Sequence, residues 1–223
     1  MGTLIIEGGY VIPVRPKGKI IRDGAVVIED DRIVFVGKRD EARRKYHSDE
    51  VIRAYKHVII PGLINAHTHL FQSILRNIGI DMELVSWLRT SIHPTLASFT
   101  SQDFYVAAKW GIIENIKSGV TTLIENNYGP RGHEEVIKAL RELKIRAVLA
   151  RGIYELNVLL DELKEKPEDA LRHVEYLVKK YHGIDDGMLM IAVAPMHPYN
   201  ASKELLLKAK ELSDRCNIIY HTH

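Results

Sequence analysis

The sequence has little of three things: cysteine, net charge and long apolar runs. Its single cysteine, Cys216, cannot form an internal disulfide, which is typical of a reducing compartment. Lysine and arginine total 31 against 29 acidic residues, and this balance excludes a concentrated basic surface for nucleic acid. No apolar run approaches the about 18 residues of a membrane span, and the first residues do not resemble a targeting leader. These absences predict a cytoplasmic protein that binds neither nucleic acid nor membranes.

The sequence does contain enough apolar residues for a core, which make up 46% of the chain. Within residues 1–60 the apolar residues form short β-branched runs. Residues 4–6 and 10–12 are separated by two glycines, and an acidic turn lies between residues 25–28 and 33–36, as in a hairpin. We therefore predict a β-rich first domain over residues 1–60, ended by a Pro-Gly pair.

After that pair, short apolar strands alternate with longer helical patterns. Strands are predicted at residues 63–67, 121–126, 146–151, 188–194 and 217–220, and helices at residues 103–117, 133–143, 167–181 and 203–215. Such continuous apolar strands are buried on both faces of a parallel sheet, so residues 61–223 are predicted to form an α/β domain of five βα units. Five units fit a doubly wound sheet, whereas a (β/α)8 barrel needs eight.

Two His-x-His pairs give the sharpest chemical signal. His67 and His69 end the first apolar strand of this domain, and His221 and His223 follow the last one. Side chains at i and i+2 of a strand share a face, so each pair offers two imidazoles to one cation. Neutral imidazole nitrogens suit zinc, and the carboxyl ends of parallel strands are where such folds place their chemistry. The two pairs together predict a shared metal site.

Residues 61–72, Pro-Gly-Leu-Ile-Asn-Ala-His-Thr-His-Leu-Phe-Gln, resemble the first-strand metal motif of the amidohydrolase superfamily. The similarity is closest to its aminohydrolase branch, which includes methylthioadenosine/S-adenosylhomocysteine deaminases, guanine deaminases and triazine chlorohydrolases. It continues through residues 81–88, 119–122, 146–152 and 194–199. The resemblance implies an incomplete (β/α)8 TIM barrel of five βα units, with residues 1–60 forming the N-terminal part of a β-sandwich subdomain.

The resemblance also implies a mechanism. One divalent metal, with zinc expected and iron as the alternative, would be held by His67, His69 and His223, with His221 as the fallback ligand. Metal-activated water would deaminate an amino-substituted heterocycle at a C–N bond that is not a peptide bond. The strand at residues 188–195 has no lysine for the carboxylated bridge of binuclear relatives, so one metal is expected. A single cysteine excludes the cytidine-type zinc site.

The branch further implies substrate contacts at Gln72, Arg151, His197 and Trp87, although each also has a structural interpretation. Gln72 could simply begin a helix, Arg151 could form a salt bridge at the barrel rim, and Trp87 could be a packing residue. Adenosine-type members use a glutamate where this chain has Leu96, and a histidine where it has Met196 beside His197. These departures leave purine, pterin, pyrimidine and triazine rings all open as the small-molecule substrate.

The family's proton-shuttling glutamate and its metal-binding aspartate are expected beyond residue 223, so no catalytic residue is assigned within the chain. We therefore expect an N-terminal fragment with little activity alone, completed by a C-terminal chain or present as a homo-oligomer. Two alternatives remain at this stage. One is hydrolysis of a cyclic amide by the same metal chemistry, and the other is a non-catalytic subunit completed by another chain.

Overall fold

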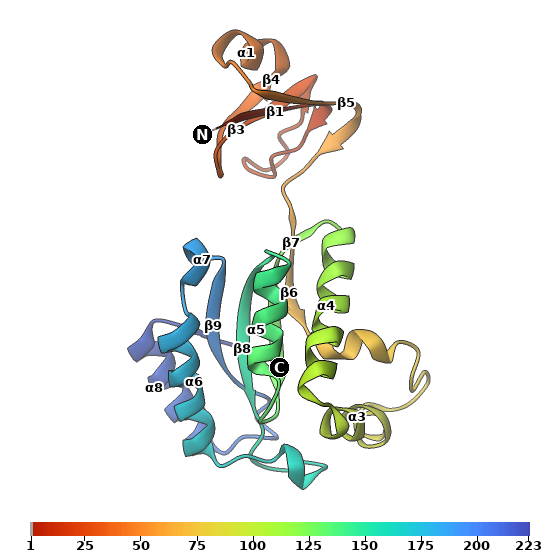
Figure 1. The fold of residues 1–223 in the computed structure, drawn as a ribbon, viewed down its shortest axis with the longest axis vertical. Coiled ribbons are helices and arrows are strands. Elements are labelled where there is room, and N and C mark those ends of the chain that lie inside the picture. Colours follow the sequence, from red (N-terminus) through yellow and green to blue (C-terminus); the bar gives the residue numbers. More distant parts are fainter. Residues whose placement is uncertain (1) are drawn as a thin grey trace. The chain divides into compact units, whose positions relative to one another are not determined.

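The computed structural model describes residues 2–223, which divide into two compact units, Met1–Gly62 and Leu63–His223. Each unit is built around a sheet of its own (Figure 1). Within the described residues, no helix combines the length and the apolar character needed to cross a membrane.

The first unit is one five-stranded sheet with a short helix. Its strands have the order β2-β1-β3-β4, and β5 pairs in parallel with β1 on the free side. The elements are β1 (Thr3–Val11), β2 (Ile21–Arg22), β3 (Gly24–Glu29), β4 (Arg32–Lys38), α1 (Arg39–Lys45) and β5 (Glu50–Ile59). The predicted hairpin is confirmed as the antiparallel pair of β3 and β4. Residues 2–62 thus supply one sheet, and a sandwich requires a second.

The apolar runs at residues 4–6 and 10–12 belong to one strand at least as far as Val11, because β1 runs unbroken through Gly8 and Gly9. The pairing of β1 with β5 shifts register between Gly8 and Tyr10. A Cβ on Gly9 would lie 2.3 Å from the carbonyl oxygen of Tyr55, so the two backbones approach too closely for any side chain. The glycines therefore permit a bulge within a strand instead of ending it.

The second unit confirms the predicted α/β architecture. Its five strands are all parallel, in the order β10-β9-β8-β7-β6. They are β6 (Leu63–Thr68), β7 (Val120–Tyr128), β8 (Arg146–Ile153), β9 (Leu189–Pro195) and β10 (Ile219–Tyr220). Each prediction from the apolar runs falls on one of these strands. Sequential parallel strands joined by helices form the first part of a curled (β/α) barrel.

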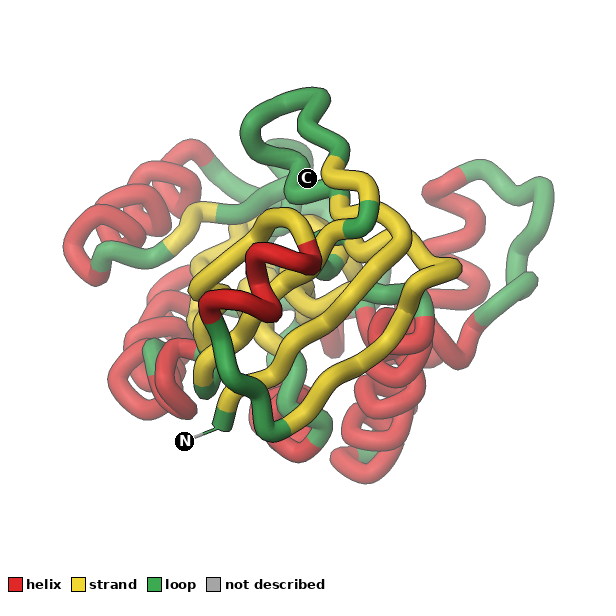
Figure 2. Tube along the Cα trace, turned by 90° about the horizontal axis from the view of Figure 1, so that it is seen from above, coloured by secondary structure: helices red, strands yellow, loops and turns green. Residues whose placement is uncertain are grey.

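Helices cover the outer face of this sheet (Figures 1 and 2). The predicted ones are α4 (Ser101–Lys117), α5 (His133–Glu142), α6 (Pro167–Tyr181) and α8 (Lys203–Cys216), and a short α7 (Ile184–Gly187) precedes β9. Leu123, Leu149 and Ile191 from three adjacent strands pack with α4, α5 and α6 in the largest apolar core. The opposite face carries small residues, with Ala150, Ala192 and Ala194 fully buried, as the tapered interior of a barrel requires.

Helix α4 ends at Lys117, as predicted, and begins at Ser101, two residues before the predicted range. Thr100 caps it: the hydroxyl accepts the Asp103 amide, and the Asp103 carboxylate accepts the Thr100 amide at 2.8 Å. This reciprocal arrangement satisfies two amides that have no partner within the helix. At the other end Gly119 follows the last turn with φ +84°, a backbone conformation that favours glycine.

The segment between β6 and α4 contains four short helical pieces that the sequence did not predict. They are η1 (Leu70–Leu75), α2 (Leu84–Trp87), a π-helical turn η2 (Leu88–Ile92) and α3 (His93–Ser98). Each is six residues or shorter, and none is capped by a side chain of its N-cap residue. Helices this short have little periodicity, and tertiary packing stabilises them instead of local propensity.

Gly111 lets η1 lie directly against α4. A Cβ at this position would be 2.5 Å from Ser73 Oγ, 2.9 Å from Leu70 Cδ2 and 3.1 Å from the Leu70 carbonyl oxygen. Glycine normally costs a helix interior about 1 kcal/mol relative to alanine, so its presence here serves the contact and not the helix.

We expect Gly111→Ala to lower the free energy of unfolding by about 1–3 kcal/mol, because overpacking outweighs the gain in helix propensity. The measurement is urea unfolding followed by circular dichroism. Unfolding at a higher urea concentration than the wild type would show instead that η1 can shift without cost.

Candidate metal centre

The two histidine pairs come from the two edge strands of the sheet. β6 ends at Thr68 and β10 ends at Tyr220, with three strands between them. In a flat sheet, four steps of about 4.8 Å would separate these strands by about 19 Å. Yet His69 Nε2 lies 3.1 Å from His223 Nε2, and His67 Nδ1 lies 2.9 Å from His221 Nε2. The curl of the half-barrel therefore assembles the site, which the sequence alone cannot specify.

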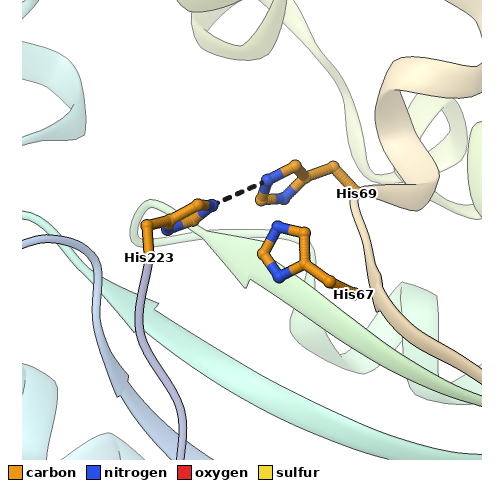
Figure 3. A group of neighbouring side chains, drawn as sticks. All are labelled: His67, His69 and His223. Atoms are coloured by element: carbon orange, nitrogen blue, oxygen red, sulfur yellow. Dashed lines mark hydrogen bonds between the residues drawn. The ribbon is translucent and has the colours of Figure 1, made fainter.

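His67, His69 and His223 form a compact group in which one nitrogen of each ring lies within 4.8 Å of the others (Figure 3). His67 and His69 are on neighbouring positions of one segment, and His223 approaches from the other pair. Their rings face one another across a common point. This is the geometry of three imidazoles around one cation.

Hydrogen bonds define which nitrogen of the His69 ring and of the His223 ring is free to bind a metal. His69 Nδ1 lies 2.7 Å from the carbonyl oxygen of Asn126, and His223 Nδ1 lies 2.8 Å from that of Met196. A carbonyl oxygen only accepts, so each Nδ1 carries the proton and each Nε2 has a lone pair. Orienting a ligand imidazole through its other nitrogen is the usual arrangement in metal sites.

The two free Nε2 atoms provide a test of whether a metal fits. Two neutral lone pairs at 3.1 Å repel unless a cation, either a proton or a metal ion, lies between them. Ligand nitrogens at about 2.0–2.1 Å from a tetrahedral zinc are about 3.3–3.4 Å apart, close to the observed separation. His69 and His223 therefore fit one metal ion with small adjustment, and His67 offers a third nitrogen within 4.8 Å of theirs.

His221 contacts His67 and is outside the three-histidine group. The two rings are stacked, with their centroids 5.1 Å apart. If His67 Nδ1 donates to His221 Nε2, then His67 also has its Nε2 free, as the other two rings do. In this arrangement His223 lies in the three-histidine group, and His221 contacts that group through His67.

Burial favours the neutral form of His67, His69 and His221. Burial is the main cause that lowers the pKa of His69 to about 4, with repulsion from the neighbouring histidines acting against the opposing hydrogen bond to Asn126. Burial is also the main cause that lowers the pKa of His67 and of His221, and repulsion from His223 adds to both. A metal ion requires deprotonated imidazole nitrogens, so the environment favours ligation at neutral pH.

Gln72 lies close to this group through Tyr128. The Gln72 side-chain amide donates to the Tyr128 hydroxyl at 3.3 Å, and the Tyr128 ring meets the His69 ring edge-on at 5.2 Å between centroids. Tyr128 also contacts Phe71 and Tyr154 in an aromatic cluster that includes the buried Leu96 and Met196. Gln72 thus has a protein partner, Tyr128, whose ring contacts a member of the three-histidine group.

Arg151 lies on the face of β8 that packs against the helices, away from the barrel interior. It alternates with the residues that line the barrel interior and shares a face with Leu149, which packs against the helices. Its guanidinium forms a bidentate ion pair with Glu165, one of whose bonds is 2.6 Å, and also donates to the Gly152 carbonyl at 2.7 Å. Both side chains are buried. The pair ties the loop after β8 to its own strand.

His197 and Trp87 have separate surroundings. His197 is exposed in the loop after β9, where its Nδ1 accepts the amide of Tyr199 at 2.9 Å. The Trp87 indole donates to the Ile78 carbonyl at 2.9 Å and covers Gly79, where a Cβ would be 2.3 Å from the ring. These contacts give Trp87 a packing role, the structural interpretation offered by its sequence.

Three polar residues near the end of β7 were not predicted as site residues from the sequence. Glu125, Asn126 and Asn127 are fully buried, and the two asparagine side chains have no hydrogen-bond partner among the described residues. Burial raises the pKa of Glu125 to about 8, against a hydrogen bond from the Leu70 amide that lowers it. His93, in α3, is also buried with both ring nitrogens unpaired in the described chain. Three polar residues ending an apolar strand were the available signal.

The chain is similar to known proteins in sequence and in fold. Residues 58–223 match the model described as the amidohydrolase family. A 5-methylthioadenosine/S-adenosylhomocysteine deaminase of Desulfitobacterium hafniense is 33% identical over 225 residues, which cover 100% of this chain and 49% of the relative. A Bacillus cereus protein of the same name is 32% identical over 215 residues, covering 96% of this chain and 48% of its own. The chain spans about half the length of these curated relatives.

Solved structures give the same picture of the fold. An adenosine deaminase from Xanthomonas campestris with bound zinc aligns with a TM-score of 0.89 at 24% identity, over 99% of this chain and 48% of the other. A guanine deaminase from C. acetobutylicum aligns with a TM-score of 0.85 at 23% identity, over 99% of this chain and 52% of the other. Both alignments cover about half of a longer chain.

Proposed function

Because the chain belongs to the amidohydrolase family, we propose that it supplies the metal-binding strands of a hydrolase that removes an amino group from a heterocycle. The observation that carries this proposal is the group of His67, His69 and His223, two of which have Nδ1 bonded to a carbonyl and Nε2 free. The names of the curated relatives, which are deaminases, support the C–N bond as the one cleaved.

Zinc is the proposed metal. Three imidazoles and no thiolate form a ligand set that zinc accepts in catalytic sites, which keep one position open for water. When bound, such an ion lowers the pKa of its water towards 7, which supplies a nucleophile at neutral pH. Iron(II) also accepts imidazole, so metal analysis must discriminate between the two.

The chain's own residues would hold the metal and orient the histidine rings that bind it. Asn126 and Met196 fix the rings of His69 and His223 through backbone carbonyls, and His221 orients His67. Tyr128 and Gln72 form a polar contact next to His69, where a substrate ring could exchange hydrogen bonds with the amide. No carboxylate among the described residues contacts the three imidazoles, so proton transfer is left unassigned.

The substrate is proposed to be an amino-substituted purine, pterin, pyrimidine or triazine. Leu96 and Met196 are buried in the aromatic cluster beside His69, and neither offers a hydrogen bond to a sugar hydroxyl. The panel for the assay should therefore include free bases and triazines as well as nucleosides.

The test measures ammonia release from 5′-methylthioadenosine, S-adenosylhomocysteine, adenosine, guanine and amino-triazines. The zinc-loaded chain is assayed alone and mixed with the part of the Desulfitobacterium hafniense relative that it does not match. We expect ammonia from at least one compound in the mixture, little from the chain alone, and none after chelation. The control is the same mixture with His69→Ala.

No ammonia from any compound, with zinc bound, would contradict deamination. Opening of a cyclic amide without ammonia would replace it with hydrolysis of that class. Full turnover by the chain alone would show that these residues carry every catalytic group.

A further inference from the structure

Glu125 is a buried carboxyl group whose position is not explained by packing. It lies on β7 and shares a face with Leu123, so it points away from the barrel interior into the layer beneath the helices. The side chain is fully buried, and its Oε1 has no hydrogen-bond partner among residues 2–223. Burying a carboxyl in this way is unfavourable, and an apolar side chain would avoid the cost.

The other carboxyl oxygen has a specific partner. Glu125 Oε2 accepts the backbone amide of Leu70 at 2.7 Å, 55 residues away in the sequence. Leu70 is the first residue of η1, and first-turn amides have no partner within their own helix. The N-cap residue of η1 is His69, whose side chain is directed to the other histidines and does not cap the helix. Glu125 therefore supplies from a neighbouring strand the cap that His69 does not supply.

The strand pairing is irregular at the same place. β6 pairs with β7 through Asn65 and Leu123 and then through Thr68 and Glu125, with a register shift between them. His67 lies in this irregular stretch, so the regular ladder does not fix the backbone that carries the two histidines. The hydrogen bond from Leu70 to Glu125 restores a fixed point immediately after His69.

The next residue of β7 holds the ring of the same histidine. The carbonyl oxygen of Asn126 accepts His69 Nδ1–H at 2.7 Å. Consecutive residues of one strand thus fix the backbone after His69 and the orientation of its imidazole. We propose that Glu125 is a positioning residue, a role that rests on the proposed metal site. Its carboxyl group caps η1 and so directs His69 Nε2 towards the metal.

The charge state of Glu125 agrees with this role. Burial raises its pKa to about 8, so the carboxyl is largely protonated at neutral pH. A neutral carboxyl resembles the amide of glutamine in shape and retains a carbonyl oxygen that accepts a hydrogen bond. Glu125→Gln should therefore preserve the cap, whereas Glu125→Leu removes it and Glu125→Asp is too short by one methylene to reach Leu70.

The test measures zinc affinity and the visible spectrum of the cobalt(II)-loaded chain for these three variants. Loss of an orienting group around a metal ligand typically weakens metal binding by about 10–100-fold. We expect that loss and an altered cobalt spectrum for Glu125→Leu and Glu125→Asp, and values near wild type for Glu125→Gln. Leu149→Ala is the control, because it opens a cavity in the same layer, on β8, without touching the turn.

Each outcome separates the positioning role from general destabilisation. Wild-type affinity and spectrum in Glu125→Asp or Glu125→Leu would overturn the proposal, as would an equal loss of affinity in Leu149→Ala. If Glu125→Leu does not fold, the comparison of zinc affinity between Glu125→Asp and Glu125→Gln decides whether Glu125 has the positioning role. If the wild-type chain binds no zinc or cobalt, the proposed function fails first, and this result is distinguishable from the others.

Discussion

Replacing His69 with alanine should reduce zinc affinity more than about 100-fold, because the loss of an orienting group alone costs about 10–100-fold and His69 is a direct ligand in the proposed site. Both nitrogens of the ring have a neighbour, with Nδ1 on Asn126 and Nε2 facing His223. Isothermal titration with zinc and metal analysis after dialysis provide the measurement.

His221→Ala should behave differently. His221 contacts His67 and does not belong to the group of three, so its loss should weaken zinc by about 10–100-fold without abolishing binding. His57→Ala, which removes an exposed histidine in the other unit, is the matched control and should leave affinity unchanged. Wild-type zinc content in His69→Ala would disprove the assignment, and a larger loss in His221→Ala than in His223→Ala would exchange the roles of those two residues.

Breaking the ion pair between Arg151 and Glu165 should cost about 3–5 kcal/mol of unfolding free energy, because removing one partner leaves the other charge buried. Both side chains are almost inaccessible, at 2% and 8% exposed, and the guanidinium forms two hydrogen bonds to the carboxylate. Arg151→Leu tests this by urea unfolding. The double variant Arg151→Leu with Glu165→Leu should recover much of the loss, because no unpaired charge remains.

An exposed ion pair provides the comparison. Arg172 and Asp169 are adjacent on one helix face with side chains 69% and 59% exposed, so Arg172→Leu should change stability by less than about 1 kcal/mol. A similarly small effect for Arg151→Leu would mean that water reaches the Glu165 carboxylate once Arg151 is lost. The pair would then not anchor the loop after β8.

Local pattern was enough to predict much of this fold. Continuous apolar runs marked all five parallel strands, and helical spacing of apolar residues marked α4, α5, α6 and α8. The antiparallel pair of β3 and β4 followed from its acidic turn. These features depend on neighbours within a few residues, so sequence alone contains them.

The errors lie where a distant backbone decides the local structure. Gly8 and Gly9 separate two apolar runs in the sequence, but beside β5, which approaches closely, they form a bulge within the single strand β1. The short helices between β6 and α4 are uncapped by their own side chains, and Gly111 and Glu125 stabilise η1 from other elements. No local signal distinguishes such residues from a loop.

The sequence by itself determined that two His-x-His pairs end parallel strands, since spacing and strand alternation place each pair on one face. Only the tertiary structure decided which rings meet and through which nitrogen. The curl of the sheet brings β6 and β10 together, and the carbonyls of Asn126 and Met196 select Nε2 of His69 and His223. Curvature is a property of the whole sheet, so no single segment encodes it.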